Sequence, residues 1–229
     1  MATKKRSFEP DSCYHIYNCG VEKRKTFNDD RDYSRFLKTI EYYLYSQIIP
    51  YSQFNKLVEE SQKAYLKTNP PGSRTKCVAI FSYCLMPNHF HFLIKQLNTS
   101  GIKDFLSDIT NSYTKYFNTK YDRFGYLFQG NFKAKEITDV NSFLQVSRYI
   151  HLNPIKSTKT NWQKELESYP YSSYKNWIRP EDSSIIKLKE RETLLELRPK
   201  EYQKFVNSKA IRNSFASIED LILEDNHLN

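Results

Sequence analysis

The strongest structural signal lies in residues 77–95, which read CVAIFSYCLMPNHFHFLIK. Aliphatic, β-branched and aromatic residues of this kind favour β-strands. Proline cannot donate a hydrogen bond to a strand ladder, so Pro87-Asn88 interrupts the run. The pattern therefore predicts a hairpin whose first strand ends near Met86 and whose second strand begins at His89.

Helical patterns stand on both sides of this hairpin in the chain. The capping signal Asn28-Asp29-Asp30 precedes apolar residues at three- and four-residue spacing. After the hairpin the same spacing returns in a longer series. The apolar positions are Tyr33, Phe36, Leu37, Ile40 and Leu44 in the first helix, and Ile102, Phe105, Leu106, Ile109, Tyr113, Tyr116 and Phe117 in the second.

The outer segments complete a recognisable order of elements. Residues 14–19 are rich in β-formers and end at Gly20, and residues 128–137 alternate between apolar and polar side chains. A further helix is predicted from about Asp139 to Asn153, where Pro154 stops it. The order β-α-β-β-α-β predicts an α+β, ferredoxin-like fold, an antiparallel sheet with two helices on one face and one added helix.

The composition and length of the chain indicate what class of protein it is. Its 229 residues are 39% hydrophobic and 27% charged, which indicates a folded protein with a sizeable core. No run is long enough to span a membrane and no secretory signal opens the chain, so we expect a cytoplasmic, nucleoid-associated protein. We expect a domain over residues 1–155, with an insertion of one short helix at about 46–75, and a C-terminal extension of loops and helices over 156–229.

The charge balance favours a polyanionic partner. Lysine and arginine number 35 against 26 acidic residues, a formal net charge of +9, and 15% of residues are aromatic. Basic and aromatic side chains together suit single-stranded nucleic acid, although many of the aromatics must fill the core. The five glycines form neither a P-loop nor a dinucleotide-binding motif, which argues against an enzyme that uses ATP or a dinucleotide.

Two short motifs carry candidate chemistry. His89 and His91 are two apart on a predicted strand and project from the same face, where both could reach one metal ion. Tyr149 and Asn153 are four apart, so they share a face of the last helix. The apolar stripe of that helix runs through Val140, Phe143, Leu144 and Ile150, and on a helical wheel Tyr149 points nearly opposite to it.

Together these motifs resemble a known family. The segment Met86-Pro87-Asn88-His89-Phe90-His91, followed by Tyr149-Ile150-His151-Leu152-Asn153-Pro154, resembles the single-tyrosine transposases of the HUH class. It is most similar to the REP-associated tyrosine transposases of bacteria. The similarity runs from Tyr14-His15-Ile16-Tyr17-Asn18 through residues 128–133 to Pro154, and a weaker similarity is found at Trp177.

The resemblance implies a fold, a chemistry and a set of residues. It implies a ferredoxin-like domain in which His89, His91 and Asn153 bind a divalent metal, Mg²⁺ or Mn²⁺. By the same resemblance, Tyr149 is the nucleophile that attacks single-stranded, hairpin-forming DNA and leaves a 5′-phosphotyrosine and a free 3′-hydroxyl. A tyrosine hydroxyl has a pKa of about 10, so a metal on the scissile phosphate would help it react near neutral pH.

Several further residues are candidates for DNA contacts. Arg148, beside the nucleophile, is expected to meet a phosphate, as are two lysines on the last strand and three basic residues in the first loop. For each of these, a plain solvated basic face is the alternative. His15 either lines the site or is a structural histidine. The strand and loop residues are Lys133, Lys135, Lys23, Arg24 and Lys25.

Two alternative functions stay open at this point. One is a DNA- or RNA-binding protein that keeps the fold without the chemistry, which the intact set of His89, His91, Tyr149 and Asn153 argues against. The other is a nucleotide hydrolase with a histidine nucleophile, which would need a third histidine where Leu93 stands. The DNA target, and whether the protein acts as a monomer or a homodimer, are not decided by the sequence.

Overall fold

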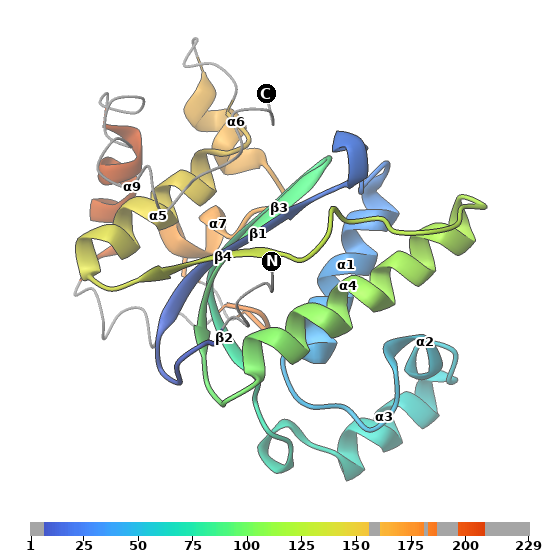
Figure 1. The fold of residues 1–229 in the computed structure, drawn as a ribbon. Coiled ribbons are helices and arrows are strands. Elements are labelled where there is room, and N and C mark those ends of the chain that lie inside the picture. The colour runs from blue at the N-terminus through green and yellow to red at the C-terminus, as the bar shows by residue number, and fades with distance from the viewer. Residues whose placement is uncertain (1–6, 156–160, 181–182, 187–196, 209–229) are drawn as a thin grey trace, which may run out of the picture.

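The computed structural model describes residues 7–155, 161–180, 183–186 and 197–208. These residues form one β-sheet with helices on both of its faces. The sheet has four antiparallel strands in the order β2-β3-β1-β4 (Figure 1). This order confirms the predicted ferredoxin-like α+β fold. The strands are β1 (Cys13–Cys19), β2 (Val78–Met86), β3 (His89–Gln96) and β4 (Lys133–Ile137).

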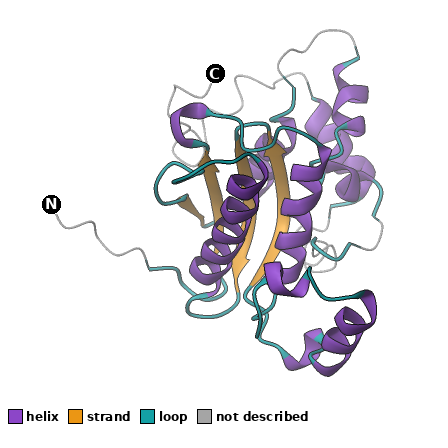
Figure 2. Ribbon diagram, turned by 90° about the vertical axis from the view of Figure 1, so that its right-hand side faces the viewer, coloured by secondary structure: helices purple, strands orange, loops and turns teal. Residues whose placement is uncertain are grey.

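Two long helices cover one face of this sheet, as Figure 2 shows. They are α1 (Asp30–Tyr43) and α4 (Gly101–Lys120), and both confirm the helices predicted from apolar spacing. Helix α1 begins where Asp29 accepts a hydrogen bond from the backbone N–H of Asp32, the expected capping contact. Between the helices and the sheet lies a first core that contains Phe90, Phe92 and Ile94, the side of β3 opposite its histidines.

The insertion between α1 and β2 folds as a small helical element beside the ends of α1 and α4 (Figure 1). It contains α2 (Tyr51–Phe54), α3 (Glu59–Thr68) and a 3₁₀ turn, η2 (Pro71–Ser73). One short helix was expected there, and two are found. A second 3₁₀ turn, η1 (Val21–Lys23), follows the end of β1.

The opposite face of the sheet is covered by the later part of the chain. Its helices are α5 (Val140–Leu152), α6 (Trp162–Ser168), α7 (Tyr174–Ile178) and α9 (Pro199–Asn207). Trp177 is buried there, and its indole N–H donates to the backbone carbonyl of Phe81 in β2 at 2.8 Å. Beyond residue 155, the described residues thus form the second layer of helices on the sheet, around a core of their own.

The helices predicted for the C-terminal extension are found only in part among its described residues. Residues 183–186 are not helical, and Ile186 instead bridges Ile80 on β2. An additional bridge joins Cys84 of β2 to Ser172, so this chain segment helps to cover the outer edge of the sheet. Residues 187–196 and 209–229 lie outside the described residues.

The last strand is shorter than predicted. The alternation of side chains indicated a strand from Phe128, but β4 begins only at Lys133. Phe128 forms an isolated bridge to Gly20, and after it the backbone turns at Gly130, whose φ is +59°. A left-handed residue interrupts a strand, and glycine allows it at little steric cost.

The buried surface of α5 also differs from the helical-wheel expectation. Val140, placed on the apolar stripe, is 53% exposed, whereas Ser147 and His151 are fully buried. The reason is that α5 is covered on two sides, by the sheet and by the C-terminal helices. A single-stripe pattern describes a helix with one buried side, so it could not locate the second one.

His151 joins these layers and carries a stability prediction. Its ring is buried, with Nδ1 2.7 Å from the Tyr202 hydroxyl and Nε2 2.8 Å from the Ser173 hydroxyl. Replacing His151 by Ala is expected to lower the free energy of unfolding by about 2–4 kcal/mol, because it leaves a cavity and two buried hydroxyls that lose a partner. Urea denaturation measures this, with the exposed Asn141→Ala on the same helix as control. A loss below about 0.5 kcal/mol would contradict the structural role.

In the part of the chain that the structure describes, no helix is long and apolar enough to cross a membrane.

Candidate active site

The predicted histidine pair lies on the sheet face that α5 covers. His89 and His91 project from the start of β3, with ring centroids 5.0 Å apart and ring planes at 86°. Strand register places Tyr17 opposite His91, and Lys133 opposite Tyr17. Directly paired residues on neighbouring strands point to the same face, so these side chains form a row across three strands.

Helix α5 brings Tyr149 onto this row. The Tyr149 ring contacts the His91 ring edge to face, at a centroid distance of 5.6 Å. It makes a similar contact with His15 at 5.9 Å. Tyr149 is partly buried, and so keeps a side that solvent can reach. The candidate nucleophile therefore stands beside the histidine pair, as the family resemblance implied.

The end of α5 sets the position of Asn153. Pro154 ends the helix, and the Asn153 side-chain amide donates to the backbone carbonyl of Tyr149 at 3.1 Å. That bond turns the amide oxygen toward β3, where Oδ1 lies 3.3 Å from Nε2 of His89. The structure thus brings together all four residues of the implied catalytic set.

A second layer of side chains orients the two imidazoles. The Asn88 amide oxygen lies 2.7 Å from Nδ1 of His89, and an amide oxygen can only accept, so this nitrogen carries a proton. Nδ1 of His91 lies 3.0 Å from Nε2 of His15, which is fully buried. Nδ1 of each ring is thus engaged by a neighbour, and Nε2 of His89 faces Asn153. This is the arrangement usual for metal-binding histidines.

The donor set fits a small divalent cation. When the His89 ring is neutral with its proton on Nδ1, Nε2 presents a lone pair to Oδ1 of Asn153, another acceptor, and a cation between them would satisfy both. Adjacent ligands of an octahedral Mg²⁺ or Mn²⁺ ion are about 3 Å apart, close to the observed 3.3 Å. Within the described ranges, no group of three or more His, Cys, Asp and Glu side chains could hold a metal ion, so the set depends on the Asn153 amide.

Arg148 does not fit the phosphate contact expected of it. Its side chain is 2% exposed, and its guanidinium donates to the backbone carbonyl of Ser208 at 3.0 Å and lies 5.0 Å from the Phe205 ring. Burial lowers the pKa of this guanidinium, which the Tyr202 hydroxyl partly offsets. The residue holds α9 against α5, on the side of the helix away from Tyr149. We therefore correct the sequence prediction for Arg148.

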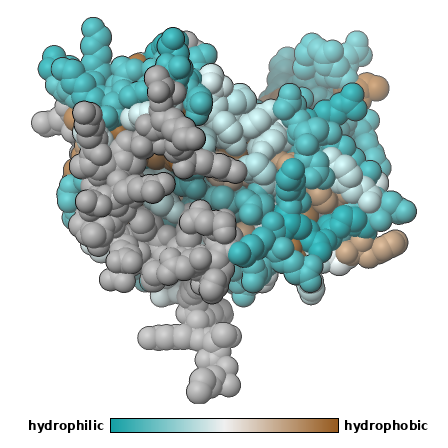
Figure 3. Space-filling view, turned by 90° about the horizontal axis from the view of Figure 1, so that it is seen from above, coloured by the Kyte–Doolittle hydropathy of each residue, from teal (hydrophilic) through white to brown (hydrophobic). Residues whose placement is uncertain are grey.

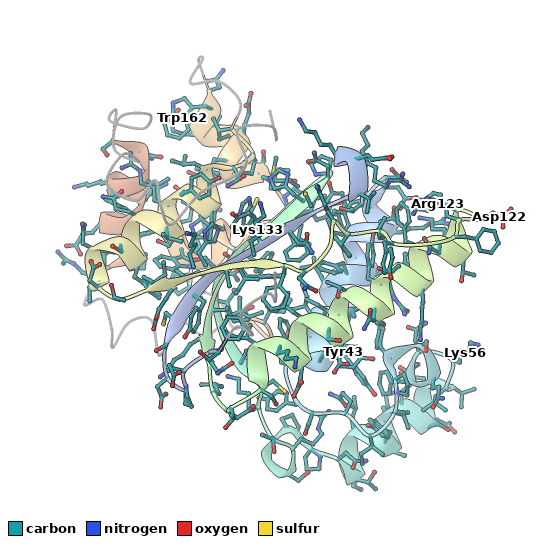
Figure 4. The ribbon with its side chains drawn as sticks, in the orientation of Figure 1. Tyr43, Lys56, Asp122, Arg123, Lys133 and Trp162 are labelled. Carbon is teal, nitrogen blue, oxygen red and sulfur yellow. The ribbon has the colours of Figure 1, made fainter. Side chains whose placement is uncertain are left out.

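The other basic candidates lie around the site. Lys133 and Lys135 pair with Tyr17 and His15 in the strand register, and so share their face of the sheet. Lys133 Nζ is 6.0 Å from the centre of the Tyr17 ring, and Figure 4 shows Lys133 over the sheet.

The first-loop candidates lie at the end of the sheet where the histidines begin. Lys23, Arg24 and Lys25 follow Gly20, whose backbone N–H donates to the carbonyl of Asn88 at 2.8 Å. Lys23 and Lys25 are exposed, whereas Arg24 is partly buried and pairs with Glu22 at 3.1 Å.

Sequence reasoning missed the roles of Asn88 and Tyr17. Asn88 belongs to the motif that carried the resemblance, and its position beside His89 was the signal that could have identified it. Tyr17 stacks on both His15 and His91, at centroid distances of 5.3 and 5.8 Å. No local pattern pointed to Tyr17, because only the strand register places it there.

The geometry can now be compared with known proteins. Residues 49–153 match the family model of IS200-like transposases. This match confirms the resemblance to single-tyrosine transposases, and it covers the hairpin with the two histidines and the helix with Tyr149 and Asn153. No curated protein sequence matches the chain.

Two solved structures are similar to the chain overall. One is a REP-associated tyrosine transposase bound to a REP hairpin, at 15% identity and a TM-score of 0.47, with 82% of this chain and 92% of that chain covered. The other is a transposase candidate from Deinococcus radiodurans R1, at 12% identity and a TM-score of 0.36, with 65% of this chain and 95% of that chain covered.

Proposed function

We propose that this IS200-like transposase relative cleaves and rejoins single-stranded DNA through Tyr149, with a divalent metal as cofactor and hairpin-forming repeats as substrate. The observation that carries the proposal is the meeting of Tyr149 with His89, His91 and Asn153. His89 and His91 lie on β3, and Tyr149 and the C-cap residue Asn153 belong to α5 and its end, at least 58 positions later in the chain. A plain binding surface has no need for a phenol beside two oriented imidazoles.

The proposed reaction exchanges one phosphate ester for another. The Tyr149 hydroxyl oxygen attacks the phosphorus and loses its proton to solvent, while the bond from phosphorus to the 3′-oxygen breaks. The 3′-oxygen takes up a proton and leaves as a free hydroxyl, and the strand on the 3′ side of the break stays joined to the tyrosine through its 5′-phosphate. Attack by a 3′-hydroxyl on this linkage reverses the exchange. The energy of the ester is kept, so rejoining requires no ATP.

Nε2 of His89, Nε2 of His91 and Oδ1 of Asn153 would hold the metal. Bound there, Mg²⁺ or Mn²⁺ would withdraw charge from the scissile phosphate and stabilise the leaving oxygen. The Tyr149 ring is held against His91, so its hydroxyl needs little reorganisation to meet a phosphate bound at this point. Lys133 and Lys135, on the same sheet face, would neutralise neighbouring phosphates.

His15 is proposed as a positioning residue for this metal. Replacing it by Phe keeps a flat ring but removes the nitrogen that meets Nδ1 of His91 at 3.0 Å. The expected result is an Mn²⁺ dissociation constant about 10- to 100-fold higher, the usual cost of losing such a contact. Electron paramagnetic resonance of free Mn²⁺ measures it without DNA, and His15→Gln should recover part of the affinity. Unchanged Mn²⁺ binding in His15→Phe would show that His15 is only structural.

One experiment separates the enzyme from a catalytically silent nucleic-acid-binding protein on the same fold. Purified protein is mixed with Mn²⁺ and a pool of single-stranded hairpin DNAs labelled at the 3′ end, then separated on a denaturing gel. The enzyme is expected to give a labelled band that resists SDS, because the 3′ segment remains bonded to the protein. Hairpin binding on a native gel without such a band would favour the silent alternative.

A further inference from the structure

Two aromatic side chains stand out from the surface of the loop between α4 and β4. Phe124 is 90% exposed and Tyr126 is 86% exposed. The other large hydrophobic residues that the structure shows as exposed are aliphatic and belong to other segments: Ile48, Leu57, Val58, Leu66 and Val140. Among the coloured residues in Figure 3, hydrophilic ones predominate, and hydrophobic ones show in small separate areas. Two neighbouring exposed rings therefore call for a function.

The loop holds these rings outward by a fixed turn. The Asn118 side chain in α4 forms two hydrogen bonds with this loop. Its amide N–H donates to the Gly125 carbonyl at 2.8 Å, and its amide oxygen accepts from the Arg123 guanidinium at 3.1 Å. Gly125 has a φ of +83°, a conformation that other residues adopt at a cost. Because the backbone is fixed, little conformational freedom is lost when the rings bind something.

The far end of the loop is anchored beside the histidine site. Leu127 is 1% exposed, and its carbonyl accepts from the backbone N–H of Val21 at 3.0 Å. The backbone N–H of Gln129 donates to the carbonyl of Cys19 at 2.8 Å, and Cys19 pairs with His89 on its other side. From His89 across Cys19 to Gln129 is two strand spacings, about 10 Å. The three residues from Gln129 to Tyr126 add at most about 11 Å to this distance. Tyr126 therefore attaches to backbone within about 20 Å of His89, and Phe124 lies two residues, at most about 7 Å, further along the loop.

Positive charge surrounds this path. Arg123 precedes the rings, and Figure 4 shows it at the end of α4. Burial lowers the pKa of Arg123, and the positive charge of Arg24 lowers it further. Lys23 and Lys25 are exposed in the same first loop. Exposed aromatic rings beside cations are typical of surfaces that bind single-stranded nucleic acid, where rings stack on bases and cations meet phosphates.

We propose that Phe124 and Tyr126 form a stacking platform for unpaired bases of the DNA substrate. At about 3.4 Å per stacked nucleotide, a path of about 20 Å places the base on Tyr126 within about six nucleotides of the phosphate at Tyr149, with the base on Phe124 about two nucleotides beyond it. The platform rests on the proposed function in that DNA is the ligand, but it does not depend on cleavage. It recognises single-stranded segments next to the hairpin rather than the paired stem, whose base faces are covered.

The test measures binding of two DNAs by fluorescence anisotropy without metal, so that cleavage does not interfere. One is a hairpin with a ten-nucleotide dT extension on each side, and the other is the same stem and loop without extensions. The Phe124→Leu/Tyr126→Leu double variant is expected to bind the extended hairpin at least about 10-fold more weakly, because each stacked base contributes about 5- to 150-fold. Its affinity for the hairpin without extensions should stay within about twofold of wild type.

A matched control removes exposed side chains elsewhere. Ile48→Ala/Val58→Ala changes two exposed residues of the insertion and should leave both affinities unchanged. In a second readout, 2-aminopurine at successive positions of the extensions should be quenched by wild type within about eight nucleotides of the cleavage point, and not by the double variant. Equal binding of the extended hairpin by wild type and the double variant would overturn the platform, as would a lack of binding by wild type.

The two proposals fail in different ways. If wild type forms the SDS-resistant adduct but the double variant binds the extended hairpin normally, the platform is wrong and the enzyme stands. If wild type forms no adduct but the double variant loses affinity for the extended hairpin alone, the chemistry is wrong and the platform stands.

Discussion

Tyr149→Phe is expected to abolish the covalent adduct with DNA while leaving hairpin binding within about twofold of wild type. The substitution removes the one oxygen that attacks phosphorus, and a lost nucleophile lowers the rate by at least about 10³-fold. The ring itself stays, with its edge contacts to His91 and His15, so the fold and the histidine geometry are kept. The adduct is counted on a denaturing gel and the binding on a native gel.

The position of the label makes this result specific. A 5′-phosphotyrosine keeps the 3′ segment of the DNA on the protein, so a 3′ label shifts upward and a 5′ label is released on a shorter strand. Tyr45→Phe is the matched control, since Tyr45 is also partly buried but lies beside the insertion, bridged to Lys76. An adduct of normal yield in Tyr149→Phe would remove Tyr149 from the mechanism and require another nucleophile.

The parts of the fold that local patterns determine were predictable. The hairpin followed from strand-forming residues interrupted at Pro87, and α1 and α4 followed from apolar spacing. The pairing of His89 with His91 needed only the alternation of a strand. These features depend on neighbours within a few positions, which the sequence displays directly.

Features that depend on distant segments were not predictable in the same way. His15 meets His91 across 76 positions, and only the strand register decides this contact. Arg148 was assigned to phosphate because nothing in its own helix shows that α9 covers it. The second helical layer over α5 likewise buries Ser147 and His151. These three differences arise because a second element covers a side of α5 that the pattern of the helix alone would leave exposed.

The second large effect is expected at the histidine pair. His91→Ala and His89→Ala each remove one of three proposed ligands, and we expect each to reduce Mn²⁺-dependent adduct formation at least about 100-fold. His91 is fully buried, so its Ala variant also leaves a cavity, and His91→Gln serves as a second variant that fills more of the space. Adduct yield is measured over a series of Mn²⁺ concentrations, and Mn²⁺ binding is measured without DNA.

These measurements separate loss of metal from loss of folding. A variant that has lost only the metal site should keep the wild-type urea midpoint and hairpin affinity, because Lys133, Lys135 and the first loop still offer their charges. A variant that has unfolded would lose both. Wild-type protein should stop forming the adduct in excess EDTA and recover when Mn²⁺ is restored. Full adduct yield in EDTA would show that the two imidazoles act on the phosphate directly, and it would leave Tyr149 as the nucleophile in a reaction that needs no metal.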